Sequence, residues 1–333
     1  SFYLQAYNIH GENVWTSSAP YGTDVSSTKR EYPAAVSFAD FNGDGYPEVY
    51  VRNKIFDAAT GQLLVEVTSD NGNEGNAWSH KCGTTNYYGI LSAPFAADLT
   101  GDGRPELILG NEAYHIEITD RTGTGGNSAT LIASHTPPTN HSGVPSDGHT
   151  QVADFNGDGH LDVLVSTRNT YSNSAYSYYY VWDVHNNTVS NAYRVANNNG
   201  GKSIPLIADI DNDGALEVVI QTPNTGAKIR ALRYNAGTSS FSEVWTQSYP
   251  EDSWSNTLTM FDFNGDGENE LLLSSRNALY VLRASDGTPL STLSHGEVTI
   301  MDYPVIADID NDGSVEIITI DSVGTARDRK STR

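Results

Sequence analysis

The stretch "DFNGDGYPEVYV", residues 40–51, carries the pattern that decides the fold of this chain. Oxygen-bearing side chains stand at its first, third, fifth and ninth positions, glycine stands at the sixth, and an apolar run follows. The further copies occupy residues 98–109, 154–165, 209–220, 262–273 and 308–319. Successive copies begin 46 to 58 residues apart. Six copies at such regular spacing predict one structural unit that is repeated along the chain.

Short apolar runs flank every copy, such as "AAVSFA" before the first and "VYV" after it. Runs of this length, rich in Val and Ile and bounded by Gly and Asp, predict buried strands, here named A and B. A second pair of strands, C and D, is predicted on either side of Gly11, Gly61, Gly237 and Gly287, with glycine supplying the turn. No segment shows a sustained helical periodicity.

A four-stranded antiparallel unit of this length predicts an all-β fold, a β-propeller that spans residues 1–325. A β-helix needs shorter repeats, and separate sandwich domains need about 100 residues each. Residues 2–18 match a C–D hairpin, whereas 308–321 supply only strands A and B. We therefore expect six blades, the last closed by two strands from each end of the chain. A seven-bladed ring and a truncated larger propeller are the alternatives, and the basic segment 326–333 is expected to be a disordered tail.

The loops between strands A and B have the composition of a calcium site. A sharp turn at glycine lets positions 1, 3 and 5 converge, and the carbonyl group of position 7 adds another oxygen. Hard oxygen ligands at this density suit Ca²⁺ better than Mg²⁺, which demands stricter octahedral geometry. An EF-hand is excluded because it needs a Glu at position 12 and flanking helices. The expected ligands are Asp40, Asn42, Asp44, Tyr46, Glu48, Asp98, Thr100, Asp102, Arg104, Glu106, Asp154, Asn156, Asp158, His160, Asp162, Asp209, Asp211, Asp213, Ala215, Glu217, Asp262, Asn264, Asp266, Glu268, Glu270, Asp308, Asp310, Asp312, Ser314 and Glu316, with each position-7 residue contributing its backbone carbonyl.

These loops resemble the FG-GAP repeat (integrin α-like, also called VCBS), whose calcium loop reads D-x-[DN]-x-D-G-x-x-[DE]. The copy most similar to it is "VADFNGDGHLDVLVST", residues 152–167. The resemblance covers nearly the whole chain and implies a propeller with one Ca²⁺ per blade, about six in all. Thr100 departs from the pattern because a hydroxyl is a weaker ligand. Six blades would also be a departure, since propellers of this family often have seven.

Composition limits the partners and the location. A formal charge of −22 argues against nucleic acid and anionic membranes as partners. No apolar run is long enough for a membrane span, and Cys82, the only cysteine, excludes an internal disulfide. Calcium sites of extracellular modules have dissociation constants of roughly 10⁻⁴–10⁻³ M, so they fill only outside the cytosol. We therefore expect a secreted or surface-attached protein.

The function expected first is non-enzymatic adhesion or recognition of a protein or glycan, as in integrin heads, lectins and surface adhesins with such repeats. One alternative is a polysaccharide lyase with a His and a Tyr as acid and base. The candidate histidines are His135, His141 and His149, but no residue is assigned a catalytic role. The other alternative is a structural spacer within a larger surface protein. The tyrosines of 171–180 fit either sugar stacking or packing between blades.

Overall fold

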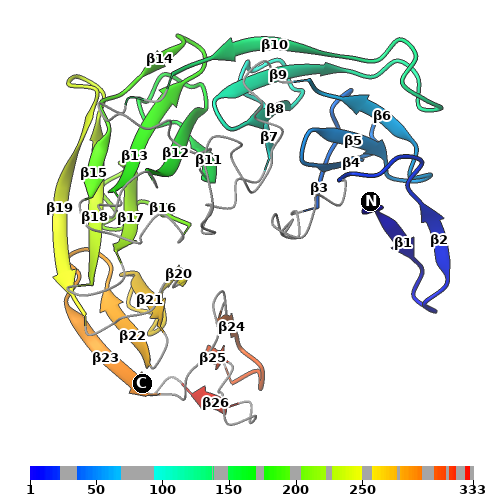
Figure 1. Ribbon diagram of the computed structural model, residues 1–333. Coiled ribbons are helices and arrows are strands. Elements are labelled where there is room, and N and C mark those ends of the chain that lie inside the picture. Colours follow the sequence, from blue (N-terminus) through cyan, green and yellow to red (C-terminus); the bar gives the residue numbers. More distant parts are fainter. Residues whose placement is uncertain are drawn as a thin grey trace. The chain divides into compact units, whose positions relative to one another are not determined.

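The computed structural model of the chain consists of β-strands joined by turns and loops (Figure 1). It describes residues 1–22, 36–68, 94–136, 138, 149–169, 176–195, 204–222, 227–249, 257–275, 278–294, 304–312, 315–319 and 327–330. Every regular element within these ranges is a strand, as the all-β prediction requires. Within the same ranges, no helix meets the length and apolarity that crossing a membrane demands.

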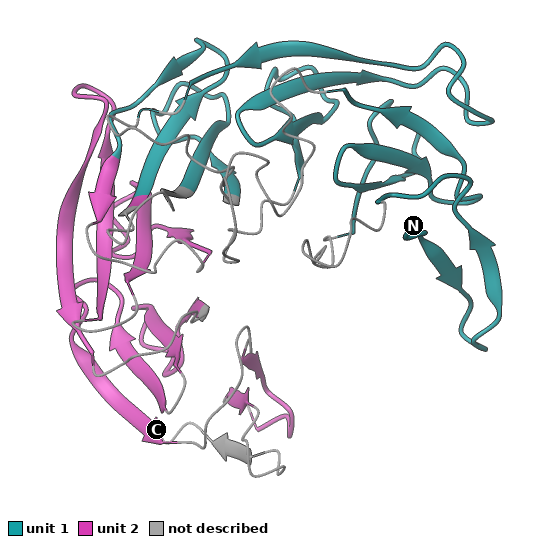
Figure 2. Ribbon diagram, viewed as in Figure 1, with its two compact units in different colours: residues 1–173, 178–192 teal, residues 174–177, 193–333 magenta. Residues whose placement is uncertain are grey.

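The chain divides into two compact units, which are described separately (Figure 2). The first unit comprises residues 1–173 and 178–192, and the second comprises 174–177 and 193–333.

The first unit holds a hairpin followed by three sheets, each of which runs through its strands in chain order. The hairpin is β1 (Gln5–Tyr7) and β2 (Asn13–Thr16). The sheets are β3 (Ser37–Ala39), β4 (Glu48–Val51), β5 (Lys54–Asp57) and β6 (Leu63–Glu66); β7 (Phe95–Ala97), β8 (Glu106–Leu109), β9 (Glu112–Glu117) and β10 (Ser128–Ser134); and β11 (His149–Ala153), β12 (Asp162–Asn169), β13 (Tyr176–Asp183) and β14 (Thr188–Val189).

The second unit repeats the same arrangement. Its strands are β15 (Tyr193–Val195), β16 (Leu206–Ala208), β17 (Glu217–Thr222), β18 (Lys228–Asn235), β19 (Ser240–Ser248), β20 (Thr257–Phe261), β21 (Glu270–Ser274), β22 (Ala278–Arg283), β23 (Pro289–Ser294), β24 (Val305–Ala307), β25 (Glu316–Thr319) and β26 (Arg327–Lys330). The sheets run β16 to β19, β20 to β23 and β24 to β26. The basic residues of β26 pair antiparallel with β25, where the sequence predicted a disordered tail. A ladder of backbone hydrogen bonds needs no apolar pattern, and this is why the composition of the segment misled the prediction.

Every acidic loop connects the first two strands of its sheet, and the residues at its two ends are paired across those strands. Ala39 pairs with Glu48 and Ala97 pairs with Glu106, and the other four loops close in the same register. The predicted order of strands A, B, C and D is thereby confirmed as a repeated antiparallel meander. Closure of a six-bladed ring stays a prediction.

The second strand is buried on both of its faces in the sheets that contain β4, β8, β12, β17 and β21. In β8, Leu107 and Leu109 pack toward the sheet of β3 to β6, whereas Ile108 packs toward the sheet of β11 to β14. Coverage on both faces explains why these strands are continuous apolar runs rather than alternating ones. The inference of buried strands from short apolar runs is confirmed.

A tryptophan from the last strand of one sheet packs onto a glycine turn of the next. Trp15 of β2 lies over Gly61, between β5 and β6, and its Nε1 donates to the carbonyl oxygen of Ala58 at 3.1 Å. Trp245 of β19 lies in the same way over Gly287, between β22 and β23, and its indole N–H donates to a turn carbonyl at 3.0 Å. The hairpin of β1 and β2 thus packs on its neighbouring sheet in the same way as strands C and D of a full sheet pack on the sheet that follows.

One predicted glycine turn is wrong in detail. Gly11, Gly61 and Gly287 have φ between 72° and 79°, as the hairpin prediction requires. In the turn between β18 and β19, however, Ser239 has the positive φ, 47°, and Gly237 does not. The turn is longer than a two-residue hairpin loop, and its left-handed residue falls two positions later.

Candidate metal-binding loops

Each acidic loop is organised by its first aspartate. In loop 154–162, Asp154 Oδ1 accepts the backbone N–H of Asp158 at 3.2 Å, and Oδ2 accepts that of Gly159 at 2.9 Å. The same bonds recur in loops 98–106 and 262–270. Gly159 has φ 87°, a left-handed conformation that residues with a Cβ adopt only with strain. The sixth-position glycine therefore makes the sharp turn that the sequence predicted.

The carboxylate at the ninth position is buried. It is the first residue of the second strand, and its exposed fraction is 3% or less in all six loops. One of its oxygens accepts the backbone N–H of the second loop residue at 2.8–3.1 Å, as Glu48 Oε2 does from Phe41. Buried charges need such partners. The sequence predicted an oxygen ligand here but gave no sign that it would be buried, and the six loops differ in what its other oxygen meets.

Loop 308–316 differs from the others in the surroundings of that second oxygen. Glu316 is fully buried, and its Oε1 forms no hydrogen bond with any part of the chain that the structure describes. Carboxylate oxygens of Asp308, Asp310 and Glu316 lie within 4.8 Å of one another. A buried carboxylate oxygen without a partner is costly, and a divalent cation would satisfy it. The residues of this loop therefore fit a calcium ion.

Loop 154–162 concentrates negative charge around a buried aspartate. The pKa of Asp162 is raised to about 7, mainly by burial and also by the charges of Asp183, Asp158 and Asp154, against the lowering effect of the N–H of Phe155. A cation among these groups would remove the repulsion that holds the proton on Asp162. The residues of this loop also fit calcium.

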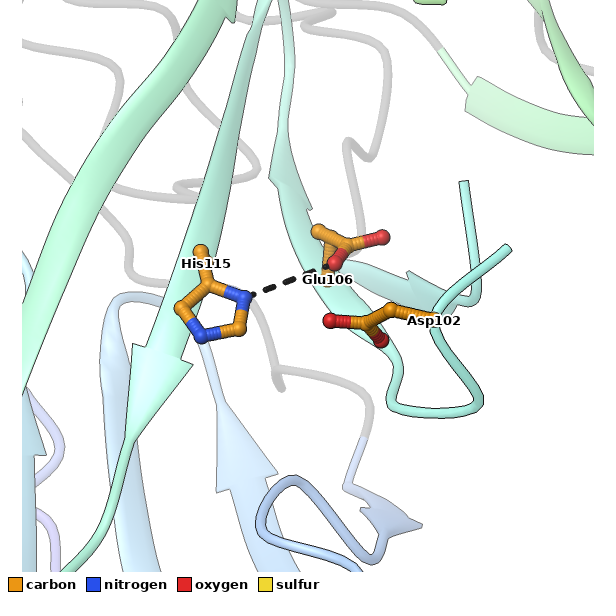
Figure 3. A group of neighbouring side chains, drawn as sticks. All are labelled: Asp102, Glu106 and His115. Atoms are coloured by element: carbon orange, nitrogen blue, oxygen red, sulfur yellow. Dashed lines mark ion pairs between the residues drawn. The ribbon is translucent and has the colours of Figure 1, made fainter. Parts of the chain in front are cut away.

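Loop 98–106 gains a histidine that the sequence analysis missed (Figure 3). His115 of β9 points toward the loop, and its Nδ1 lies 3.6 Å from Glu106 Oε1. Thr100 Oγ1 donates to the same oxygen at 3.2 Å. Ligand atoms of Asp102, Glu106 and His115 lie within 4.8 Å of one another. Strand pairing was the signal that could have found His115, since β9 runs antiparallel beside the strand that Glu106 begins.

In loop 262–270 the nearest arginine is directed away from the carboxylates. Arg283 pairs with Glu270 in the register of β21 and β22. Its Nη1 lies 3.1 Å from Asp286, and its Nε lies 3.8 Å from Glu268. Burial, followed by the charges of Asp266 and other loop carboxylates, raises the pKa of Glu270, although the N–H of a neighbouring backbone group lowers it. The loop therefore keeps a largely uncompensated set of oxygens, which also fits a cation.

Loops 40–48 and 209–217 differ because one arginine side chain pairs with both the fifth- and the ninth-position carboxylate, whereas Arg104 of loop 98–106 lies 3.8 Å from the fifth-position Asp102 only. The guanidinium group of Arg121 contacts Asp44 and Glu48, and that of Arg233 contacts Asp213 and Glu217. These contacts use oxygens that the sequence assigned to calcium. Oxygens of Asp209, Asp211 and Glu217 lie within 4.8 Å of one another. In both loops, however, a guanidinium group already pairs with the fifth- and ninth-position oxygens that a divalent cation would need.

Within each unit, loops of neighbouring sheets lie next to one another. In the first unit, a Cβ built on Gly43 would lie 3.8 Å from the side chain of Arg104, and one built on Gly101 would lie 3.8 Å from that of His160. In the second unit, Asn212 Nδ2 donates to the carbonyl oxygen of Gly267 at 3.3 Å. In the first unit, the position-7 residue of one loop thus covers the fourth-position glycine of the loop before it.

Only part of the expected histidine and tyrosine cluster is described. His141 and Tyr171 lie outside the described residues. His135 Nε2 lies 3.1 Å from the hydroxyl oxygen of Tyr180, and burial lowers the pKa of His135 to about 4. Tyr178, Tyr179 and Tyr180 are 1–2% exposed, so the packing interpretation holds for these three and sugar stacking does not.

Comparison with protein families places the chain in a class of repeat proteins, and the matched segments include all six loops. The FG-GAP-like repeat matches residues 98–165, 154–220, 209–273 and 262–319, and the FG-GAP repeat matches residues 32–77. The matches cover more than half of the chain, and the chain belongs to the FG-GAP repeat family. A comparison with curated protein sequences finds no match.

Two solved structures are similar to this chain at low sequence identity. The V. cholerae biofilm matrix protein Bap1 is 13% identical, with a TM-score of 0.56 over 96% of this chain and 70% of that one. BBS1N, solved in complex with ARL6DN, is 12% identical, with a TM-score of 0.44 over 90% of this chain and 78% of that one. The likeness to Bap1 supports the propeller-like repeat fold.

Proposed function

We propose that this chain is a calcium-stabilised extracellular domain that recognises a protein or a glycan without chemical conversion. The observation that carries the calcium part is Glu316 Oε1, a buried carboxylate oxygen that lies beside two further acidic ligands and has no hydrogen-bond partner among the described residues. Membership of the FG-GAP repeat family supports the same interpretation. The residues that would hold calcium are those of loops 98–106, 154–162, 262–270 and 308–316, and calcium would supply charge neutralisation there.

An extracellular location follows from the weakness of such sites. Extracellular calcium modules bind with dissociation constants of roughly 10⁻⁴–10⁻³ M, a range that cytosolic calcium never reaches. Calcium at about ten times its dissociation constant stabilises a site by about 1.4 kcal/mol, so several loops together would matter for folding. The similarity in fold to a biofilm matrix protein supports a location outside the cell.

Recognition is preferred over a lyase activity because of where the His–Tyr pair lies. A lyase needs its acid and base within reach of the polysaccharide. Tyr180 is 1% exposed and packs in a cluster with Trp182 and Val165, so a sugar chain does not reach its hydroxyl group. The spacer hypothesis differs from recognition only in lacking a ligand, and binding experiments separate the two.

Removal of calcium should lower the melting temperature of the chain, and added calcium should restore it, because the loop carboxylates repel one another without a cation. Glu316→Gln should reduce the calcium-dependent rise more than Thr100→Ser does, since glutamine keeps the acceptor for the Ile309 N–H but loses the charge. Differential scanning calorimetry with and without a calcium chelator measures both effects. An identical melting temperature in both conditions would contradict the calcium role.

The recognition part is tested by a panel of glycans and acidic polysaccharides scored for binding and cleavage together, in calcium and in chelator. We expect binding that needs calcium and no rise in absorbance from unsaturated sugar products. A rise in absorbance would favour the lyase. Neither binding nor cleavage, with no protein ligand found at the same concentrations, would favour the spacer.

A further inference from the structure

Arg233 contacts three side chains of its loop at once. Its Nη1 lies 2.7 Å from Asp213, its Nη2 lies 3.1 Å from Asp211, and the same guanidinium group pairs with Glu217. Those residues hold the fifth, third and ninth positions of loop 209–217. Arg233 reaches them from β18, where it pairs with Glu217 across the strands.

Arg121 reaches the equivalent place in loop 40–48 from a different element. Its Nη1 lies 2.8 Å from Asp44, 2.9 Å from Glu48 and 3.4 Å from the carbonyl oxygen of Tyr46. These are the fifth, ninth and seventh positions of the loop. Its Nε also pairs with Asp57, at 2.7 Å, and Asp57 stands opposite Glu48 in the register of β4 and β5. Arg121 itself follows β9, in the next sheet of the same unit.

The two arginines therefore use the set of oxygens that a cation in such a loop would use. A guanidinium group offers several N–H donors in a fixed plane and pairs strongly with carboxylates. It is attached to the chain, so it competes with free calcium at a high effective concentration. The same arrangement arises from two unrelated positions in the chain, which argues that it is selected by the charge of the loop.

The remaining loops provide an internal comparison. Arg283 occupies the same register position as Arg233, yet its guanidinium group lies against Asp286 and Glu268 instead of the fifth and ninth positions. In loop 308–316 the residue opposite the ninth position is Lys330 rather than an arginine, and Glu316 Oε1 has no hydrogen-bond partner among the described residues. An arginine opposite the ninth position therefore does not always enter the loop. Whether it does depends on whether another carboxylate, such as Asp286, binds its guanidinium group instead.

We propose that the guanidinium groups of Arg121 and Arg233 are built-in cations that replace calcium in loops 40–48 and 209–217, so that these loops bind no metal. The proposal rests on the calcium role proposed above for the other loops. It corrects the expectation of one ion per repeat to four ions at most, in loops 98–106, 154–162, 262–270 and 308–316. Each unit then contains one sheet whose acidic loop holds a guanidinium group in place of calcium.

The test is a count of calcium ions per chain by equilibrium dialysis at about 5 mM free calcium, above the weakest range for extracellular modules. The wild type should bind four ions or fewer. Arg233→Gln and Arg121→Gln should each bind one more than the wild type. Arg283→Gln is the matched control and should bind the same number as the wild type, because its guanidinium group lies outside the cage.

A second pair of variants decides the matter if either glutamine variant fails to fold. Glu217→Gln should leave the calcium count of the otherwise wild-type chain unchanged, whereas Glu316→Gln should lower it by one. A gain in neither arginine variant, or a loss of one ion in Glu217→Gln, would overturn the proposal. A wild type that binds no calcium would overturn the proposed calcium role, but a gained ion in Arg233→Gln would still support the built-in cation.

Discussion

Replacing Asp162 with asparagine should stabilise the calcium-free protein by about 3 kcal/mol at pH 8 and by almost nothing near pH 4. The pKa of Asp162 is raised from 3.8 to about 7 in the folded chain, mainly by burial and then by neighbouring carboxylates. Asparagine keeps an oxygen for the N–H of Phe155 but carries no charge. The substitution therefore removes a cost that exists only when the folded carboxyl group is forced to ionise.

The direction of the pH dependence follows from the raised pKa of Asp162. Between about pH 4 and pH 7, the folded chain holds a proton that the unfolded chain releases. Stability falls as the pH rises through this range, and the full cost is present above the folded pKa of about 7. Urea unfolding of the metal-stripped protein at several pH values measures the difference between the two chains.

Asp158→Asn is the matched control, because it lies in the same loop with a shift of opposite sign. The N–H of His160 is the main cause that lowers the pKa of Asp158, so its charged form supports the fold above its unfolded pKa, and that support is lost as the pH falls. Asp158→Asn should therefore not stabilise at pH 8. In calcium the Asp162→Asn chain should lose its advantage, since a ligand is gone. Equal stability of wild type and Asp162→Asn at pH 8 without calcium would contradict the assignment.

Gly61→Ala should destabilise the chain by about 3 kcal/mol, against about 1 kcal/mol for Gly11→Ala. Both glycines have positive φ, 72° and 79°, so both substitutions strain the backbone. A Cβ at Gly61 would also lie 2.5 Å from Cε3 of Trp15, whereas nothing lies within 4 Å of one at Gly11. The indole ring cannot yield without weakening its bond to the carbonyl oxygen of Ala58.

Gly287→Ala repeats the test in the second unit, because its Cβ would lie 2.6 Å from Cε3 of Trp245. Chemical unfolding followed by tryptophan fluorescence gives the free energies of all three variants. If Gly61→Ala and Gly11→Ala cost the same, backbone strain alone explains the glycine and the tryptophan contact contributes nothing.

The repeated loops and strands were predictable because their chemistry is local. Six carboxylate loops, the strands beside them and the glycine turns at Gly11, Gly61 and Gly287 all follow from residues that are close in sequence. The turn at Gly237 failed since a longer loop shifts the left-handed residue to Ser239.

The partners of the loops were not predictable in the same way. Arg121 lies 73 residues from Glu48, and nothing in the spacing indicates that the two meet. Arg233 and His115 were more accessible to prediction, because antiparallel pairing places them beside Glu217 and Glu106. The loops were interpreted as calcium sites, so positive charges supplied by the chain itself were not sought.

The tryptophan contact gives the repeats a direction. In both places the indole lies in a Val-Trp-Thr segment at the end of one sheet, and the glycine that receives it lies in the following sheet. Neither receiving turn contains a tryptophan that could pack onto the preceding sheet. Two such sheets therefore join in one order only. Sheets joined by this interface could therefore be exchanged or multiplied in an engineered array, and the order in which they follow one another would be kept. Each such sheet therefore has one edge that provides the tryptophan and another that provides the glycine turn.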